Sequence, residues 1–448
     1  MSSGVMALLS RRRRPRPSTP ARADPRAEAP AGFCVDSGRL NVEAPDTFDT
    51  PVNLIRLFAI ADERSLDVHP SALGEATRRL KLINASVRRD PDANAAFLDV
   101  VASPRQPAAA LGLMNEAGVL GRFLPEFGRI VAQMQFNMYH HFTVDEHTLR
   151  GIEVISEIEK GLHEESHPLA TSIFPKIINR RALYLAMLLH DTGKGDGDQQ
   201  IEGEKSARSA CERLGVPAEE AKLVAWLVRH HLVMSDTAQK RDLSDPRTIA
   251  QFAKQVGSLE KLRLLLVLTV ADIRAVGPAL WNDWKGQLLR ELYRFTEAAF
   301  HGGRSDEDGV RQQLAASALE AKQIVLQHLG HPGDAAWADA MEDGYWFSHA
   351  RDALIWHAEA ATRARRNGAI PHAAARHRVE QGVTEILIYA GDRPGLFASL
   401  AAAISASGAN IADARIHTTR DGAAFDVFSV QTTNHKPFGL TNPPQLEA

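Results

Sequence analysis

The stretch Leu188-Leu189-His190-Asp191-Thr192-Gly193-Lys194-Gly195 joins an apolar segment to a glycine-containing turn, and it decides the expected fold. The uninterrupted apolar run from Leu183 to Leu189 predicts a buried helix, which the glycines end. An imidazole and a carboxylate at the mouth of such a helix would cost roughly several kcal/mol if they were buried without partners. A metal ion is the partner that these two ligand types favour.

The composition is that of an ordinary globular protein of about three domains. Of the 448 residues, 44% are hydrophobic, which is enough for extensive cores. The formal net charge is −3, so the chain as a whole does not indicate nucleic acid or an anionic membrane as a partner. The two cysteines, Cys34 and Cys211, are too few and too far apart to indicate a disulfide framework, which favours the cytoplasm.

No targeting or membrane segment is evident. The longest apolar candidate, Leu264 to Ala271, is followed at once by Asp272 and is too short to span a membrane. Arg11 to Arg14 follow a short apolar stretch, whereas a secretory signal has its basic residues first. Residues 1–31, rich in Arg, Pro and Ala, are therefore expected to be a disordered basic tail or a misassigned start.

The rest of the chain is predicted to be mostly α, with one α+β segment near its end. Residues 32–135 are expected to form a helical connecting region, and residues 301–378 a helical extension. Within residues 379–434 the hydrophobic period changes to two, and the order is βαββ: a strand at 384–389, a helix at 396–407, and strands at 410–419 and 424–431. Residues 435–448 form a short tail.

A second ligand type occurs at the start of another predicted helix. Thr143 and Glu146 have the spacing of a capping box, which predicts that a helix begins there. His147 then lies in the first turn, on the same face as the apolar residues Val154 and Ile158. A single inward histidine is more often a hydrogen-bonded core residue than a ligand. His147 is of interest only because other ligand types recur downstream.

A carboxylate completes the series. Asp272 ends the apolar run of a helix predicted over residues 259–275, and it needs either a metal or a buried arginine as a partner. With His147 and the His190-Asp191 pair it gives the order His, His-Asp, Asp on successive helices. Imidazole nitrogens and carboxylate oxygens suit Mn²⁺, Mg²⁺, Fe²⁺ or Zn²⁺, and an open coordination position can activate water. This order resembles the HD phosphohydrolase superfamily, which consists of all-helical, metal-dependent enzymes.

Longer strings resemble one family more closely. They are residues 114–128, residues 139–140 and 143–148, Met234-Ser235, residues 238–239 and 241–246, and residues 281–282 and 284–285. These strings are similar to the bifunctional uridylyltransferase/uridylyl-removing enzymes, which modify the nitrogen-regulatory PII protein. The resemblance covers the chain from residue 32 to its end.

The resemblance implies a hydrolase that removes UMP from a tyrosine of PII, in a domain spanning residues 136–300. The residues that match the family's metal ligands are His147, His190, Asp191 and Asp272, with Mn²⁺ or Mg²⁺ as the expected ion. Asp191 could also hold or deprotonate the attacking water, and Lys194 could steady the charge of the phosphate. His231 matches a histidine of the corresponding helix and is a possible additional ligand.

The βαββ segment resembles an incomplete ACT domain, a small-molecule sensor that in this family responds to glutamine. The residues that match its ligand-binding turn and strand are Asp392, Arg393, Pro394, Gly395, Leu396, Asn410 and Ile411. The expected partners are therefore PII as substrate and glutamine as effector, with no role for nucleic acid or a membrane.

Three departures from the family pattern refine these expectations. A Gly-Ser loop followed by paired carboxylates is not found, since Gly257-Ser258 lacks the acidic pair, so transferase activity is not expected. The first ACT domain is incomplete and a second is missing, which suggests a fragment or a mispredicted reading frame. Where many members place a histidine after Gly195, this chain has Gln199-Gln200. A neutral amide is a poor ligand, which favours a single metal.

Two alternatives stay open. Enzymes that hydrolyse (p)ppGpp also combine an HD domain with an ACT domain, but they would show a Glu-Asp pair shortly after the His-Asp, where this chain has residues 192–195. The second alternative is a non-catalytic remnant that senses glutamine or binds PII. The complete ligand set argues against this remnant, and the shortened sensor argues for it.

Overall fold

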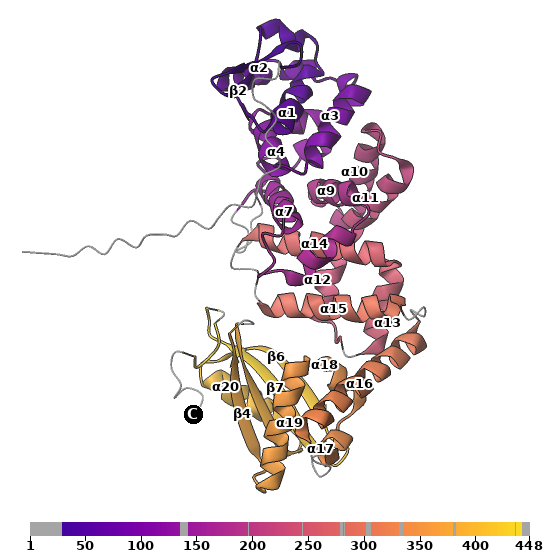
Figure 1. Ribbon diagram of the computed structural model, residues 1–448, viewed down its shortest axis with the longest axis vertical. Coiled ribbons are helices and arrows are strands. Elements are labelled where there is room, and N and C mark those ends of the chain that lie inside the picture. The colour runs from indigo at the N-terminus through magenta and orange to yellow at the C-terminus, as the bar shows by residue number, and fades with distance from the viewer. Residues whose placement is uncertain are drawn as a thin grey trace, which may run out of the picture. The chain divides into compact units, whose positions relative to one another are not determined.

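The computed structural model describes residues 29–134, 142–195, 197–243, 245–277, 281, 283–301, 306–330, 335–379, 382–434 and 436–440. In these ranges the protein is mostly helical, as predicted, and no helix there is long and apolar enough to cross a membrane. The chain divides into two compact units, Met1–Pro125 and Glu126–Ala448, whose elements are labelled in Figure 1. Both cysteines are free, as expected.

Unit 1, Met1–Pro125, packs helices against a three-stranded sheet. Strand β1 (Phe33–Asp36) pairs antiparallel with β2 (Arg39–Val42), which pairs in parallel with β3 (Asp67–Val68). The helices are α1 (Asn53–Arg64), α2 (Pro70–Arg78), α3 (Pro91–Val101), α4 (Pro107–Glu116) and α5 (Val119–Phe123). Leu54, Leu57 and Phe58 of α1 recur at helical spacing and are buried, so this helix lies in the core of the unit.

One helix of unit 1 is shorter than predicted. The apolar spacing over residues 71–87 predicts a single helix, but α2 ends at Arg78 and short 3-10 turns follow at Leu80–Leu82 and Val87–Arg89. The side-chain oxygen of Asn84 accepts hydrogen bonds from the backbone N–H groups of Ser86 and Val87. This local bonding competes with helix continuation, as is common for asparagine.

The first part of unit 2 is helical. Its helices are α6 (Pro125–Gly128, at the unit boundary), α7 (Val144–Glu159), α8 (Pro168–Ile173), α9 (Arg180–Leu189), α10 (Gln199–Arg213), α11 (Ala218–His230), α12 (Val233–Lys240), α13 (Pro246–Val256), α14 (Leu259–Val276) and α15 (Asp283–His301). All residues from Leu183 to Leu189 of α9 are fully buried, which confirms the predicted buried helix. Helices α7, α10, α11 and α14 pack around α9.

Helix α7 begins where the sequence predicts, but not through a capping box. Thr143 is the N-cap residue with extended backbone angles, and its side chain makes no capping hydrogen bond. The helix start is instead defined by its buried apolar face, which includes Val144, Ile152 and Ile155.

Helices α10 and α13 are absent from the sequence prediction. Asp198 caps α10, accepting hydrogen bonds from the N–H groups of Gln200 and Ile201, and Asp245 caps α13 with Pro246 in its first turn. These caps are readable in the sequence. The helical periodicity of α10 cannot be read from the sequence, because its buried face consists of small residues such as Gly203, Ala207 and Ala210.

The second part of unit 2 places a sheet between two helical layers (Figure 1). Helices α16 (Glu307–Leu329), α17 (Ala335–Ala340), α18 (Asp343–Ser348) and α19 (Arg351–Arg366) precede an antiparallel sheet of order β4 (His372–Arg378), β5 (Val383–Gly391), β7 (Ala423–Gln431) and β6 (Asn410–Thr418). Phe425 packs against α16–α19, and Phe428 on the other face packs against α20 (Leu396–Ala406).

The predicted βαββ order is present, and the sheet gains a further strand. Strand β4 precedes the predicted domain start at residue 379 and lies in the segment predicted to be a helical extension. It shows no hydrophobic alternation, because Arg376 and Arg378 point inward and form ion pairs with Glu385 and Asp352. The predicted domain boundaries themselves stay predictions.

The turn after α9 depends on glycine at position 193, which gives a stability prediction. A Cβ atom on Gly193 would overlap the carbonyl oxygen of Gln199 and the backbone nitrogen of Gly203, whereas a Cβ atom on Gly112 in α4 would meet nothing within 4 Å. Gly193→Ala should destabilise the protein by roughly 1–3 kcal/mol, and Gly112→Ala should leave it unchanged or more stable by about 0.5–1 kcal/mol. Thermal unfolding midpoints check this, and equal midpoints for the two variants would contradict it.

Candidate metal centre

Three helices bring the four predicted ligands together. His147 lies in the first turn of α7, His190 and Asp191 follow the last turn of α9, and Asp272 lies on α14. The Nε2 atom of His147 is 3.2 Å from Nε2 of His190 and 3.0 Å from Oδ1 of Asp272. Nε2 of His190 is 3.3 Å from Oδ2 of Asp191 and 3.6 Å from Oδ1 of Asp272. The spaced sequence order is therefore one cluster in space.

The cluster is buried, and Asp272 is its most exposed member. The side chains of His147, His190 and Asp191 are 3%, 1% and 4% exposed, whereas that of Asp272 is 18% exposed. A water molecule or a substrate would therefore reach the cluster from the side of Asp272.

A backbone contact orients the central imidazole. Nδ1 of His190 is 2.8 Å from the carbonyl oxygen of Met187, to which it donates a hydrogen bond. This bond fixes the ring so that Nε2 faces the carboxylates of Asp191 and Asp272. Second contacts of this kind are typical of metal-binding histidines.

Strong electrostatic coupling joins His190 to the two carboxylates of the cluster. Burial alone would lower the pKa of His190, but the carboxylates of Asp191 and Asp272 raise it to about 10. Burial would raise the pKa of Asp272, yet contacts with His147 and His190 lower it well below its ordinary value. Both carboxylates are thus held as anions beside two imidazoles, a donor set that fits a divalent cation.

The alternative of a buried arginine beside Asp272 is not what the structure shows. In the described ranges, the ion partners of Asp272 are the two histidines. The ligand-type atoms of His147, His190 and Asp191 all lie within 4.8 Å of one another, so these residues could hold one ion, with Asp272 beside them.

Two neighbours hold the carboxylate of Asp191 from opposite oxygens. The Nζ atom of Lys194 lies 2.5 Å from Oδ2, the oxygen that faces His190, and the amide nitrogen of Gln199 donates to Oδ1 at 2.9 Å. Lys194 therefore lies at this site, as predicted, whereas its predicted contact with substrate phosphate stays a prediction. The sequence identifies Gln199 only as a poor ligand and carries no signal of its contact with Asp191.

His231 lies beside the cluster. Its ring is perpendicular to that of His190, with 5.3 Å between centroids, and its Nδ1 is 2.7 Å from the carbonyl oxygen of Val228. Burial and the nearby His190 lower the pKa of His231, so the ring is neutral. The structure places this residue against a proposed ligand, and its own role as an additional ligand stays a prediction.

The predicted effector residues adjoin the sheet of unit 2. Residues 392–395 form the turn between β5 and α20, Leu396 begins α20, and Asn410 and Ile411 begin β6. Gly395 has a φ of 79°, a left-handed conformation that favours glycine at this N-cap position. Whether these residues bind glutamine stays a prediction. Of the quoted sequence strings, residues 139–140, Ser244 and Asn282 lie outside the described residues.

Comparisons with protein families agree with this geometry. Residues 144–275, which contain the whole cluster, match the HD domain family. Residues 33–123 match the family described as the uridylyltransferase GlnD third domain, and residues 384–441 match the ACT domain. The class of the protein is therefore that of HD-domain proteins with an ACT domain.

The similarity to whole proteins is more specific. The chain is 57% identical over 420 residues to the bifunctional uridylyltransferase/uridylyl-removing enzyme of Caulobacter vibrioides (strain NA1000 / CB15N), and 54% identical over 418 residues to that of Phenylobacterium zucineum (strain HLK1). Each match covers 93% of this chain and 44% of the relative, so the chain spans less than half the length of these relatives. The chain belongs to the family of bifunctional uridylyltransferase/uridylyl-removing enzymes.

A more distant relative and a solved structure extend the comparison. The enzyme of the same name from Novosphingobium aromaticivorans is 44% identical over 422 residues, which cover 93% of this chain and 45% of the relative. A solved tRNA-processing enzyme in an apo form aligns with 57% of this chain and 62% of its own at 15% identity, with a TM-score of 0.34. That score is too low to bear on the fold.

The contact between Gln199 and Asp191 gives a binding prediction. Gln199→Ala removes the donor that holds Oδ1, and loss of such an orienting contact typically weakens metal binding about 10–100-fold. Gln200→Ala is the matched control, since the structure gives its side chain no contact with the cluster among the described residues. Titration of Mn²⁺ followed by electron paramagnetic resonance measures both dissociation constants. Equal affinities for the two variants would show that Gln199 does not position Asp191.

Proposed function

We propose that this chain is a divalent-metal-dependent hydrolase that removes UMP from a uridylylated tyrosine of the PII protein in the cytoplasm, and that glutamine regulates it. One observation carries the proposal, namely the cluster of His147, His190 and Asp191 with Asp272 beside it, inside an HD domain. Curated relatives that are up to 57% identical are named uridylyl-removing enzymes, which supports the substrate class.

The residues that would hold the ion are His147, His190, Asp191 and Asp272. A bound Mn²⁺ or Mg²⁺ would supply Lewis-acid activation of a water molecule and of the phosphate. The reaction adds the oxygen of water to phosphorus and breaks the bond from phosphorus to the tyrosyl oxygen, which leaves as a phenolate and takes up a proton. UMP and unmodified tyrosine are the products.

Asp191 is better suited to hold the attacking water than to deprotonate it. Burial would raise its pKa, but His190 and Lys194 lower that pKa below its ordinary value. A carboxylate with a low pKa is a weak general base, although it still accepts a hydrogen bond and orients the water.

In this proposal Lys194 serves the phosphate. Its ammonium group contacts Asp191, and its side chain is 12% exposed, so an arriving phosphate oxygen could share the donor. A cation at this point stabilises the charge that develops on the phosphate oxygens in the transition state.

The proposed glutamine response has a physical connection to the metal centre. Arg415 of β6 forms an ion pair with Glu291 of α15 at 3.1 Å, and both side chains are largely buried. Strand β6 begins with the predicted effector residues Asn410 and Ile411, and α15 packs against α14, which carries Asp272. In this proposal, a change in the conformation of the sheet on glutamine binding would be transmitted through α15 to α14, the helix that carries the metal ligand Asp272.

The hydrolytic proposal predicts a specific loss of activity. Incubation of uridylylated PII with the chain and Mn²⁺ should release UMP. Asp272→Asn should reduce kcat by about 100-fold or more. The substitution replaces a charged metal ligand with a neutral one, and the bound metal is expected to stabilise the transition state by several kcal/mol. Asp236→Asn is the control, since Asp236 is 50% exposed and pairs with Lys240 on α12.

Three outcomes of this assay differ in meaning. UMP release by the wild type and by Asp236→Asn, but not by Asp272→Asn, supports the proposal. Equal release by the wild type and Asp272→Asn contradicts a metal-dependent reaction at this centre. Hydrolysis of (p)ppGpp with no UMP release favours the alternative enzyme class, and turnover of neither substrate favours the non-catalytic alternative.

A further inference from the structure

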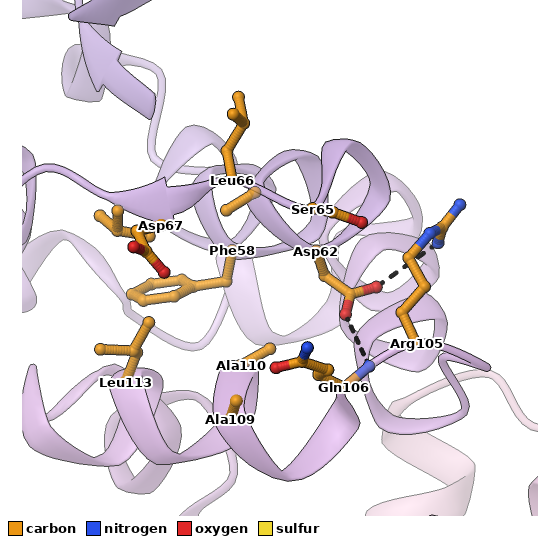
Figure 2. Close-up of a pocket in the computed structure, with 12 residues that line it drawn as sticks. Phe58, Asp62, Ser65, Leu66, Asp67, Arg105, Gln106, Ala109, Ala110 and Leu113 are labelled. Carbon is orange, nitrogen blue, oxygen red and sulfur yellow. Dashed lines mark hydrogen bonds and ion pairs between the residues drawn. The ribbon is translucent and has the colours of Figure 1, made fainter. Parts of the chain in front are cut away.

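A cavity of about 130 Å³ lies in unit 1 between α1 and α4, and neither the proposed hydrolysis nor the predicted effector residues use it. Figure 2 shows Phe58 of α1 above Ala110 and Leu113 of α4, with Asp67 beside the Phe58 ring and Asp62 toward the other end. Arg105 lies at the rim near Asp62. The cavity therefore combines an apolar floor with charged groups at its opening.

The size of the cavity fits a small organic group. Several residues of its lining are exposed, so the space is an open cleft that a ligand can enter from solvent; they are Ser65, Asp67, Arg105, Gln106 and Ala109. It persists because α4 presents alanines, including Ala110, opposite Phe58. A cavity of about 150 Å³ accommodates benzene, so this one accepts a chain of about five or six heavy atoms.

One of the two carboxylates is already engaged. The side chain of Asp62 is 7% exposed, accepts a hydrogen bond from the hydroxyl of Ser103 at 2.5 Å, and lies 3.5 Å from the guanidinium of Arg105. Asp62 and Arg105 thus offset each other in charge and form one wall of the cavity. They leave little net charge at that end.

The second carboxylate is available. Asp67, at the start of β3, is exposed and makes no ion pair with any residue in the described ranges. The charged lining, Asp62, Asp67 and Arg105, therefore carries a net negative charge of one. A carboxylate next to an aromatic ring and an apolar floor favours a cation that carries an apolar body.

We propose that this cavity binds a small aliphatic primary ammonium ion. Its nitrogen donates to the carboxylate of Asp67, and its carbon chain lies on Phe58, Ala110 and Leu113. An anion of the same length is repelled by Asp67, and a neutral alcohol loses the charge-assisted hydrogen bond. Charge and chain length together select the ligand.

Ligand-observed NMR on the full chain, at constant ionic strength, compares n-butylammonium, n-butanol and butyrate. We expect n-butylammonium to bind about tenfold more tightly than n-butanol, the ratio that one charge-assisted hydrogen bond supplies, and butyrate not to bind. Asp67→Asn should reduce the affinity for n-butylammonium to that for n-butanol. Glu63→Gln, an equal loss of charge at an exposed site on α1 outside the cavity, should change nothing.

Ala110→Leu fills the cavity and should abolish binding of both n-butylammonium and n-butanol. Asp67 is exposed, so Asp67→Asn keeps the charge test valid even if the Ala110→Leu protein does not fold. The proposal is overturned if n-butylammonium does not bind, if butyrate binds equally well, if Glu63→Gln weakens binding as much as Asp67→Asn, or if a folded Ala110→Leu protein still binds.

Discussion

The buried contact between His190 and Asp191 is the constraint on which the helical part of unit 2 depends. Both side chains follow a fully buried helix, and neither can be left there without partners. The structure meets this requirement with side chains from three other helices: His147 of α7, Asp272 of α14 and Gln199 of α10. A divalent cation would be held by the same imidazole nitrogens and carboxylate oxygens, so the fold and the proposed chemistry depend on the same residues.

The sequence predicts those residues of the site whose polar side chains would be costly to bury without partners. The apolar runs before His190 and Asp272 mark both residues as unusual, and the helical face of His147 points it inward. The pattern makes all three candidates for one centre, and the resemblance to the family implies that they are its ligands. The buried helix α9 and the mostly helical fold follow from the same apolar patterns. Resemblance adds the family, which the comparisons bear out.

The elements that the sequence does not predict are those without a periodic pattern of apolar residues. Helix α10 buries glycine and alanine, and strand β4 points arginines inward, so neither shows apolar periodicity. The contact of Gln199 with Asp191 depends on the start of α10, which Asp198 caps, and on the close packing of Gly193 against Gly203. Such contacts arise from tertiary packing between helices. They have no fixed spacing along the chain by which a single sequence could reveal them.

The most direct test of the account is the position of bound metal. A crystal of the full chain grown with Mn²⁺, with anomalous diffraction recorded at the manganese edge, should show a single strong peak in coordination contact with His147, His190, Asp191 and Asp272. A single peak there would also agree with the amide of Gln199 standing beside the ligand set rather than in it. No peak at this cluster, or a peak bound by other residues of the chain, would contradict the account.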